Sequence, residues 1–296
     1  MNPTRGNNSS WCHSTFATTR QGRLWAYVGD DLHPYTIYDY TPSRARDGPA
    51  KFLGDFAGYM QADAYGGYDG IYAGHRVIEV LCWAHARRKF FDALDTDKLR
   101  AAQALAFIRR LYEIEKRGKD LASAERARLR QEESRPVLEA LRKWLGEQSG
   151  GPSPALPKSP IGVAIHYVLA NWPALVRYTD DGDLSIDNNA AERAMRPVAL
   201  GRKNWVFAGS DNGGRTAAVL YSMVATCRRH GLDPFAYLKD VIARLSDHPA
   251  NRIDELLPDQ CKLARLPAAA DLPPASDAPD APPSNSASAP DAAHPA

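Results

Sequence analysis

The sequence contains few groups that would hold the chain together covalently. Its 296 residues include four cysteines, Cys12, Cys82, Cys227 and Cys261, which are scattered along the chain without paired spacing. This distribution argues against a disulfide framework and is typical of a reducing cytosol. No apolar run approaches the ~18 residues of a membrane span, and the polar start does not fit a signal peptide. We therefore expect a soluble cytoplasmic protein.

The chain also lacks a strong overall charge, since its formal net charge is +2. The charge is unevenly distributed, however. Residues 187–245 contain nine basic residues against five acidic ones. Local positive charge around a carboxylate suits a polyanionic partner. A solvated mixed-charge surface is the alternative that composition alone leaves open.

Residues 267–296 lack the apolar side chains of a packed segment. They consist almost entirely of Ala, Pro, Asp and Ser. Because burial of such residues cannot offset the entropy of ordering them, we predict a disordered tail. The rest of the chain is long enough for a sizeable core.

The first third of the chain alternates between strand-like and helix-like segments. Aromatic and β-branched residues at 23–28 and 35–40 are typical of a hairpin. Helical spacing follows over about 43–59, and a short buried strand at 59–63 ends in an acid. An apolar run at 77–83 then leads into a helix. This order favours an α/β layer.

The segment at 88–147 changes to charged helical sequence with recurring leucines. Helix starts are predicted at Ser134 and Ser159, each followed closely by a proline. Glycines and prolines at 150–154 mark a loop between helices. We interpret residues 88–176 as an α-helical insertion. A coiled-coil arm is less favoured because the heptads are not sustained.

The segment after the insertion is predicted to be mainly helical. A short strand is expected at 205–208, followed by a helix over 213–230 that Gly231 ends. Asp233, followed by a proline, is typical of the start of a last helix.

Two carboxylates separated by the insertion are candidate metal ligands. Asp63 follows a predicted strand, and Glu192 lies on a predicted helix among arginines. Two-metal phosphoryl transfer needs acids from separate elements, which hold cations about 3.5–4 Å apart. Taken alone, an acid such as Asp63 more often caps a turn.

Other motifs are less specific. Cys82 and His85 have the spacing of half a zinc site, but no second pair follows. A buried thiol and a hydrogen-bonded imidazole are therefore the preferred interpretation. The basic cluster at 87–89 either contacts phosphate or faces solvent. The glycine-rich residues 209–214 are compatible with a phosphate-approaching loop, although the pattern is generic.

Several of these segments together resemble the transposase of the bacterial insertion sequence 66 family. The matching segments are QADAY at 61–65, CWAHARRKF at 82–90, DNNAAER at 187–193, GRKNW at 201–205 and the residues from Tyr221 to Cys227. The resemblance runs in the same order from about residue 21 to 257.

This resemblance implies a ribonuclease H-like core with an Asp-Asp-Glu metal triad. Asp63 would be the second acid and Glu192 the third, both binding Mg²⁺ or Mn²⁺ in a two-metal site. The implied chemistry is strand cleavage at transposon ends and their transfer into target DNA. The cations expected to approach DNA phosphates are Arg87, Arg88, Arg193, Arg196, Arg202 and Lys203. A bacterial, nucleoid-associated location would follow.

The resemblance also implies a division of the chain into parts. The core would comprise residues 21–87 and 177–257, interrupted by the helical insertion at 88–176. Residues 1–20 would be an atypical segment, and residues 267–296 the tail. Partners would be DNA and, in addition, intact transposase or companion proteins of the element.

The first acid of the implied triad has no match here. Family members carry it in an Ala-Asp-Glu-Thr-Pro-like segment, whereas residues 1–20 contain no Asp or Glu. The strand-like residues 11–17 would offer His13 instead. Asp30 or Asp31 would substitute only from a neighbouring strand end. Because positioning and charge neutralisation are most of what such a site contributes, we expect a truncated or frame-shifted transposase with weak or no activity.

Two other interpretations remain open. The chain is alternatively a non-catalytic DNA-binding or oligomerising remnant that titrates intact transposase or its DNA ends. It is otherwise a decayed reading frame whose product folds poorly. Both predict an inert site, so the sequence does not separate them.

Overall fold

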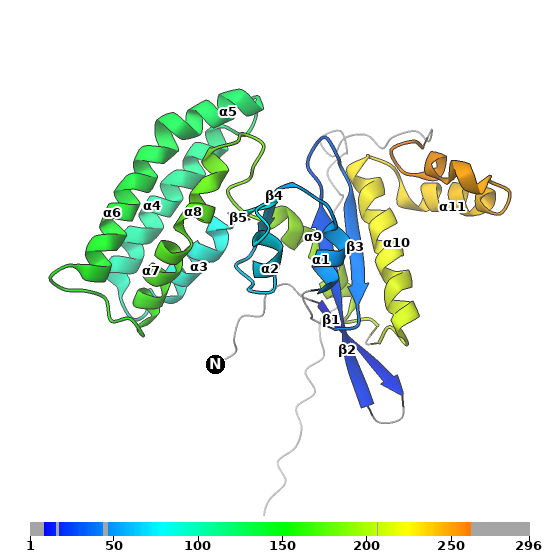
Figure 1. The fold of residues 1–296 in the computed structure, drawn as a ribbon, viewed down its shortest axis with the longest axis horizontal. Helices are drawn as coiled ribbons and strands as arrows, with labels where there is room; N and C mark the ends of the chain where they lie inside the picture. Colours follow the sequence, from blue (N-terminus) through cyan, green and yellow to red (C-terminus); the bar gives the residue numbers. More distant parts are fainter. Residues whose placement is uncertain (1–8, 16–17, 44–46, 206, 262–296) are drawn as a thin grey trace, which may run out of the picture.

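The computed structural model describes residues 9–15, 18–43, 47–205 and 207–261. For residues 9–15 and 18–20 it describes the backbone alone. A helical body and a smaller body containing a sheet lie side by side, with β4, β5 and α9 between them (Figure 1). The fold is mixed α/β and mostly helical, which confirms the predicted class at that level. No helix in the described ranges is long and apolar enough to span a membrane.

Three antiparallel strands form the first sheet. They are β1 (Ser9–Thr15), β2 (Thr18–Val28) and β3 (Thr36–Thr41), in that spatial order. The predicted hairpin is confirmed, with Leu24 opposite Tyr40. Of the strand-like residues 11–17, those at 11–15 belong to β1, which lies at an edge of this sheet, and the other two lie outside the described residues.

Two parallel strands form the second sheet. After α1 (Asp47–Leu53), β4 (Gly58–Ala62) pairs with β5 (Val77–Leu81) across α2 (Asp69–Tyr72). The helix predicted over 43–59 is therefore shorter than expected. A ribonuclease H-like sheet would have its first strand in the centre. Two separate sheets with β1 at an edge do not confirm that core.

The predicted insertion is helical, as expected. Its helices, with the one before it, are α3 (Trp83–Asp92), α4 (Lys98–Arg117), α5 (Ser123–Leu129), α6 (Arg135–Gly150), α7 (Pro160–Ala170) and α8 (Trp172–Val176), and a 3₁₀ turn, η2 (Arg177–Thr179), follows. The cap predicted at Ser159 is confirmed, because its side chain accepts a hydrogen bond from the backbone N–H of Gly162.

The helix boundary predicted at Ser134 agrees with the start of α6 at Arg135, but Ser134 makes no side-chain capping hydrogen bond. Ser134 ends a π-helical turn, η1 (Arg130–Ser134), that joins α5 to α6 without a break. A proline inside a helix removes a backbone donor and crowds the preceding turn. The wider turn just before Pro136 accommodates that proline within a continuous helical rod.

The last part of the described chain is also helical. It contains α9 (Asn189–Gly201), α10 (Asp211–Arg229), α11 (Pro234–Leu245) and the 3₁₀ segment η3 (Ala250–Leu256). Asp233 caps α11 as predicted. The strand predicted at 205–208 is wrong for the described residues, where Phe207 makes a single bridge. The predicted tail lies outside the described residues.

Two apolar clusters account for most of the buried side chains described. The large cluster joins β5 and α3 to α4, α6, α7 and α8, with Trp83 and Leu141 fully buried. The small cluster packs Leu24, Tyr38 and Tyr40 against Met195 and Val198 of α9 and Ala218 of α10. Trp83 places the large cluster across the predicted domain boundary at residue 87, and that boundary remains a prediction.

Candidate site between the two bodies

Asp63 directly follows β4, at the strand end where the sequence predicts it. Ala62 is paired with Leu81, so the chain leaves β4 beside the point where it leaves β5. Asp63 is partly exposed. Burial raises the pKa of Tyr167 to about 12, and the acid groups of Cys82, Asp63 and Glu79 add to the rise. Asp63 is therefore within electrostatic reach of α7 in the helical body.

Glu192 lies in the first turn of α9 and faces the first turn of α3. Its Oε1 is 3.4 Å from His85 Nε2, and the two side chains are 35% and 31% exposed. His85 follows β5 by four residues, so the contact brings Glu192 toward the end of the β4–β5 sheet. The other ring nitrogen, His85 Nδ1, is buried and has no hydrogen-bond partner in the part of the chain described.

Cys82 has the structural role that the sequence favours. It is buried, and its Sγ accepts a hydrogen bond from the backbone N–H of Asn188 at 3.4 Å. Burial raises the pKa of its thiol. Within the described ranges, no three His, Cys, Asp or Glu side chains gather closely enough to hold a metal ion. Among the described residues, no further side chain therefore completes a zinc site with Cys82 and His85.

Backbone contacts fix the segment that leads into α9. The N–H of Trp83 donates to the carbonyl of Ile186 at 3.1 Å. Gln61 Nε2 donates to the carbonyl of Ser185 at 2.6 Å. Residues 185–188 therefore lie along the ends of both β4 and β5. This placement explains how a helix more than one hundred residues later in the chain meets α3.

The six cations predicted to approach DNA are all exposed. Arg87 and Arg88 lie on α3, Arg193 and Arg196 on α9, and Arg202 and Lys203 immediately after α9. None of them forms an ion pair with the described part of the chain. Such cations remain available to an anionic partner.

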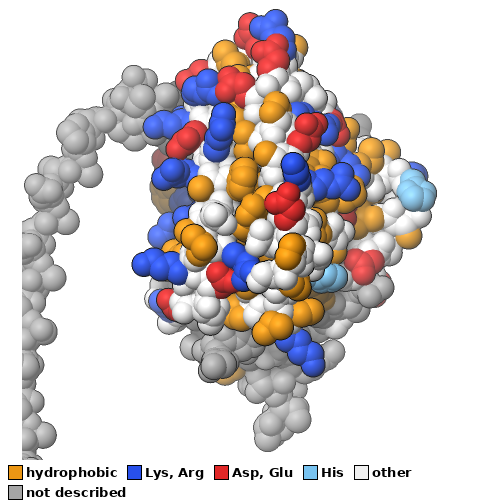
Figure 2. Space-filling model, turned by 90° about the vertical axis from the view of Figure 1, so that its left-hand side faces the viewer, with side chains coloured by type: hydrophobic (Ala, Val, Ile, Leu, Met, Phe, Trp, Pro, Cys, Tyr) orange, Lys and Arg blue, Asp and Glu red, His pale blue; other side chains and the backbone are white. Residues whose placement is uncertain are grey.

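The outer face of the helical body has a different character. Figure 2 shows Lys and Arg side chains interspersed with Asp, Glu and apolar side chains on that face. Elsewhere in the helical body, exposed charges are paired along helices, such as Arg109 with Glu113 and Arg128 with Glu132. This face therefore fits the mixed-charge alternative from the sequence.

The substitutes considered for the missing first acid are held elsewhere. Asp30 Oδ1 lies 3.0 Å from His33 Nδ1, and Asp31 lies 3.9 Å from Arg229 at the end of α10. Arg229 also donates to the carbonyl of Gly29. These contacts keep both acids at the β2–β3 turn. The side chain of His13 lies outside the described residues.

The glycine-rich residues 209–214 have a packing role. Ser210 caps α10 by accepting from the N–H of Gly213 at 3.0 Å. A Cβ on Gly214 would lie 2.5 Å from the ring of Tyr40. Tyr40 in turn donates to Asp211 at 2.7 Å. Glycine is thus needed for close approach of α10 to β3, and the phosphate-loop interpretation gains no support.

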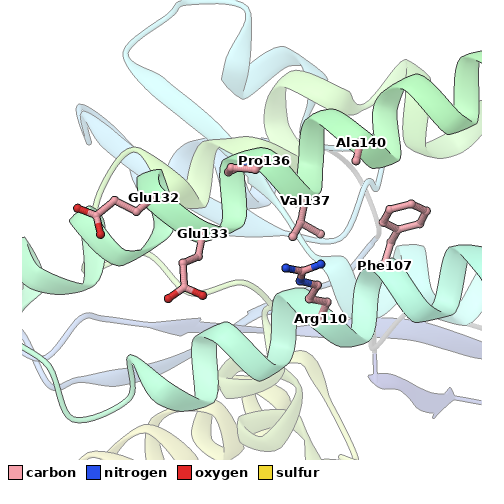
Figure 3. A pocket seen from close by; sticks show the side chains of 7 residues that line it. All are labelled: Phe107, Arg110, Glu132, Glu133, Pro136, Val137 and Ala140. Carbon is pink, nitrogen blue, oxygen red and sulfur yellow. The ribbon is translucent and has the colours of Figure 1, made fainter.

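A shallow cavity of about 250 Å³ lies in the helical body, away from both acids. Its lining residues are Phe107, Arg110, Glu132, Glu133, Pro136, Val137 and Ala140. Figure 3 shows Phe107 and Arg110 on one helix and the others on the facing rod. None of the predicted site residues lines it, so the cavity is a groove between helices and not the candidate site.

Sequence reasoning missed two contacts at this site. It did not foresee His85 as a neighbour of Glu192, or Tyr112 as a donor to Asp187 at 3.0 Å. The only available signal was that His85 and Asp187 both fall within the segments that resemble the family.

Comparison with known proteins extends the resemblance over most of the chain. The model of the Transposase IS66 family matches residues 13–216, and that of the IS66 C-terminal element matches residues 222–258. Three uncharacterized proteins of Sinorhizobium fredii (strain NBRC 101917 / NGR234) are similar. The protein y4hP is 38% identical over 82% of this chain and 48% of its own length.

The other two relatives give a similar picture. The protein y4qI is 37% identical over 81% of this chain and 47% of its own length. The protein y4jD is 34% identical over 85% of this chain and 52% of its own length. The chain thus spans about half the length of these relatives. No solved structure matches it.

Proposed function

Because the chain belongs to the IS66 transposase family, we propose that it engages the DNA of transposon ends and of the target. It would act as part of a transposase catalytic core, with weak or no strand cleavage of its own. A ribonuclease H-like ancestry of that core belongs to the same proposal. Three antiparallel strands followed by two parallel strands with intervening helices support it.

The contact between Glu192 and His85 carries this proposal. It brings the acid on α9 to the helix that follows β5, the strand paired with β4. Asp63 follows β4 directly. Two carboxylates from separate elements thus flank one junction between the two bodies, which is where ligand sites often occur.

We propose Asp63 and Glu192 as metal-binding acids. Carboxylate oxygens are the ligands that Mg²⁺ and Mn²⁺ prefer. The described residues nevertheless do not fit a complete two-metal site, since no group of three His, Cys, Asp or Glu side chains gathers among them. Losing one ligand removes both charge neutralisation and positioning. For that reason cleavage is assigned to this chain as weak or absent.

DNA would lie along the exposed face of α3 and α9. Four of the six unpaired cations lie on these helices, α9 carries Glu192, and the other two cations immediately follow α9. Phosphate contacts by Lys and Arg supply most non-specific affinity for duplex DNA and make it salt-dependent. Such cations would hold a DNA strand along α3 and α9.

A second candidate function is that of a non-catalytic remnant that binds DNA or intact transposase. The observation favouring it is that residues 1–20 contain no Asp or Glu. It shares the DNA-binding face and differs only in the absence of any cleavage.

Salt-dependent binding to a fluorescent DNA duplex tests the shared part. We expect log Kd to vary linearly with log salt between about 50 and about 200 mM, and replacing Arg193 or Arg196 with Ala to lower the slope by about 0.9 each. Lys143→Ala on α6, an exposed cation on the helical body, is the matched control and should leave the slope unchanged. If Arg193→Ala and Lys143→Ala changed the slope equally, the proposed DNA-binding face would be wrong.

Manganese binding and nicking separate the two candidates. Paramagnetic Mn²⁺ titration should show weak binding that Asp63→Asn and Glu192→Gln both reduce. Nicking of supercoiled DNA in Mg²⁺ or Mn²⁺, abolished by the same changes, would favour residual catalysis. Binding of Mn²⁺ that neither substitution alters would remove the metal assignment, while DNA binding without nicking would favour the remnant.

A further inference from the structure

Asp187 is a buried carboxylate without a cationic partner in the described part of the chain. It is 8% exposed, and none of the ion pairs described includes it. Its Oδ2 accepts hydrogen bonds from Tyr112 Oη at 3.0 Å and from Asn189 Nδ2 at 2.8 Å. Its Oδ1 accepts from the backbone N–H of Asn189 at 3.1 Å. Because an unpaired buried charge is costly, each of these donors contributes to keeping Asp187 in place.

The three donors come from two different parts of the molecule. Asn189 is the first residue of α9, so its two bonds tie Asp187 to the helix that carries Glu192. Tyr112 lies on α4 in the insertion. Asp187 is therefore a direct link between the helical insertion and the first turn of α9.

Tyr112 is well placed to hold that link rigidly. Its neighbours Leu111 and Ile108 are fully buried in the large cluster, which fixes α4. Burial is the main cause that raises the pKa of the Tyr112 hydroxyl, and the Asp187 carboxylate adds to the rise. The hydroxyl therefore stays protonated and able to donate.

Glu192 lies within one turn of this link. Its backbone N–H donates to the carbonyl of Asn188 at 3.2 Å, and Asn188 itself donates to Cys82. A shift of residues 187–189 would thus move Glu192 relative to His85. The position of the Glu192 carboxylate relative to His85 therefore depends on how firmly Asp187 is held.

We propose that Tyr112 is a positioning residue, which holds the first turn of α9, and with it Glu192, against α3 through its hydrogen bond to Asp187. The inference rests on the proposed function only for the role of Glu192. The coupling of α4 to α9 can be tested without DNA or metal, and its test does not depend on whether the chain binds either. Through this coupling, a residue of the helical insertion would help to position Glu192.

Hydrogen–deuterium exchange of the full chain tests the coupling without metal or DNA. In Tyr112→Phe, we expect amides of residues 189–194 to exchange about 10-fold faster, the factor that corresponds to ~1.4 kcal/mol. Exchange along α4 itself should be unchanged, since the ring remains packed. The imidazole resonances of His85, assigned with His85→Gln, should shift because Glu192 moves.

Two further variants make the test specific. Tyr27→Phe removes a buried hydroxyl that has no hydrogen-bond partner in the described ranges, and it should leave residues 189–194 unaffected. Tyr112→Phe combined with Asp187→Ala should add little to Asp187→Ala alone, because either change removes the Tyr112–Asp187 hydrogen bond. Unchanged exchange in Tyr112→Phe, or the same acceleration in Tyr27→Phe, would overturn the proposal.

Discussion

Arg130 is a charged side chain buried inside the helical body, with 1% of its surface exposed. Its guanidinium binds Glu115 through two hydrogen bonds of 2.9 and 2.7 Å. A third nitrogen donates to the carbonyls of Tyr178 and Asp181, both at 2.8 Å. One residue of the π-helical turn therefore ties α4 to the segment that leads toward α9.

Removing this guanidinium should strongly destabilise the protein. Arg130→Met would leave Glu115, whose side chain is only 14% exposed, without its partner. We expect a loss of about 3–5 kcal/mol in the free energy of unfolding. Urea denaturation monitored by circular dichroism measures it. Arg109→Met is the control. It removes the ion pair of Arg109 with Glu113 on α4, whose side chains are 77% and 64% exposed, and should cost below about 1 kcal/mol. Similar losses in both variants would contradict this account of Arg130.

At the scale of elements, α10 protects the outer edge of β3. The hydroxyl of Ser222 accepts from the backbone N–H of Tyr38 at 2.8 Å, and that of Thr226 accepts from the N–H of Thr36 at 3.2 Å. The Thr226 hydroxyl also lies 3.2 Å from the carbonyl of Thr36, whereas the Ser222 hydroxyl donates at 2.8 Å to the carbonyl of Ala218 on its own helix. Ser222 and Thr226 lie one helical turn apart on α10, and they bind two residues of β3 that are two positions apart. They satisfy backbone groups that would otherwise remain open at a sheet edge.

Removing one of these hydroxyls should leave a buried strand N–H unsatisfied. Thr226→Val keeps the shape of the side chain, and we expect it to cost about 1–3 kcal/mol. Thr216→Val changes an exposed threonine of α10 and should stay within about 0.5 kcal/mol. Urea denaturation compares the two. If both cost the same, the helix propensity of valine would explain the effect and edge protection would not.

The strands, helix boundaries and side-chain contacts were predictable from the sequence to different degrees. The strands around Leu24 and Tyr38, and the cap at Ser159, were predicted because local periodicity and capping chemistry determine them. The boundary at Ser134 was predicted too, but the π-helical turn before it was not, because such a turn leaves no local signature. The proximity of His85 and Glu192 was also not predictable, since spacing along the chain says nothing about residues that tertiary packing brings together. Their metal-binding and DNA-binding roles remain predictions.

At the scale of the whole molecule, the two apolar clusters differ greatly in size. Among the described residues, the large cluster contains several times as many buried side chains as the small one. The polar contacts around Asp187 and Glu192 connect the two bodies. Because apolar burial is the main source of stability, the helical body should withstand denaturant better than the body around β2 and β3.

We therefore expect unfolding in urea to proceed in two steps. Pulse labelling with deuterium should show α10 and β3 losing protection at lower urea than α4 and α6. Leu24→Ala and Leu141→Ala remove the same side chain from fully buried positions in the small and large clusters, and each should cost about 2–5 kcal/mol. Leu24→Ala should move only the first step and Leu141→Ala mainly the second. A single coincident transition that both substitutions shift equally would contradict this expectation. It would mean that the contacts at the junction make the two bodies one cooperative unit.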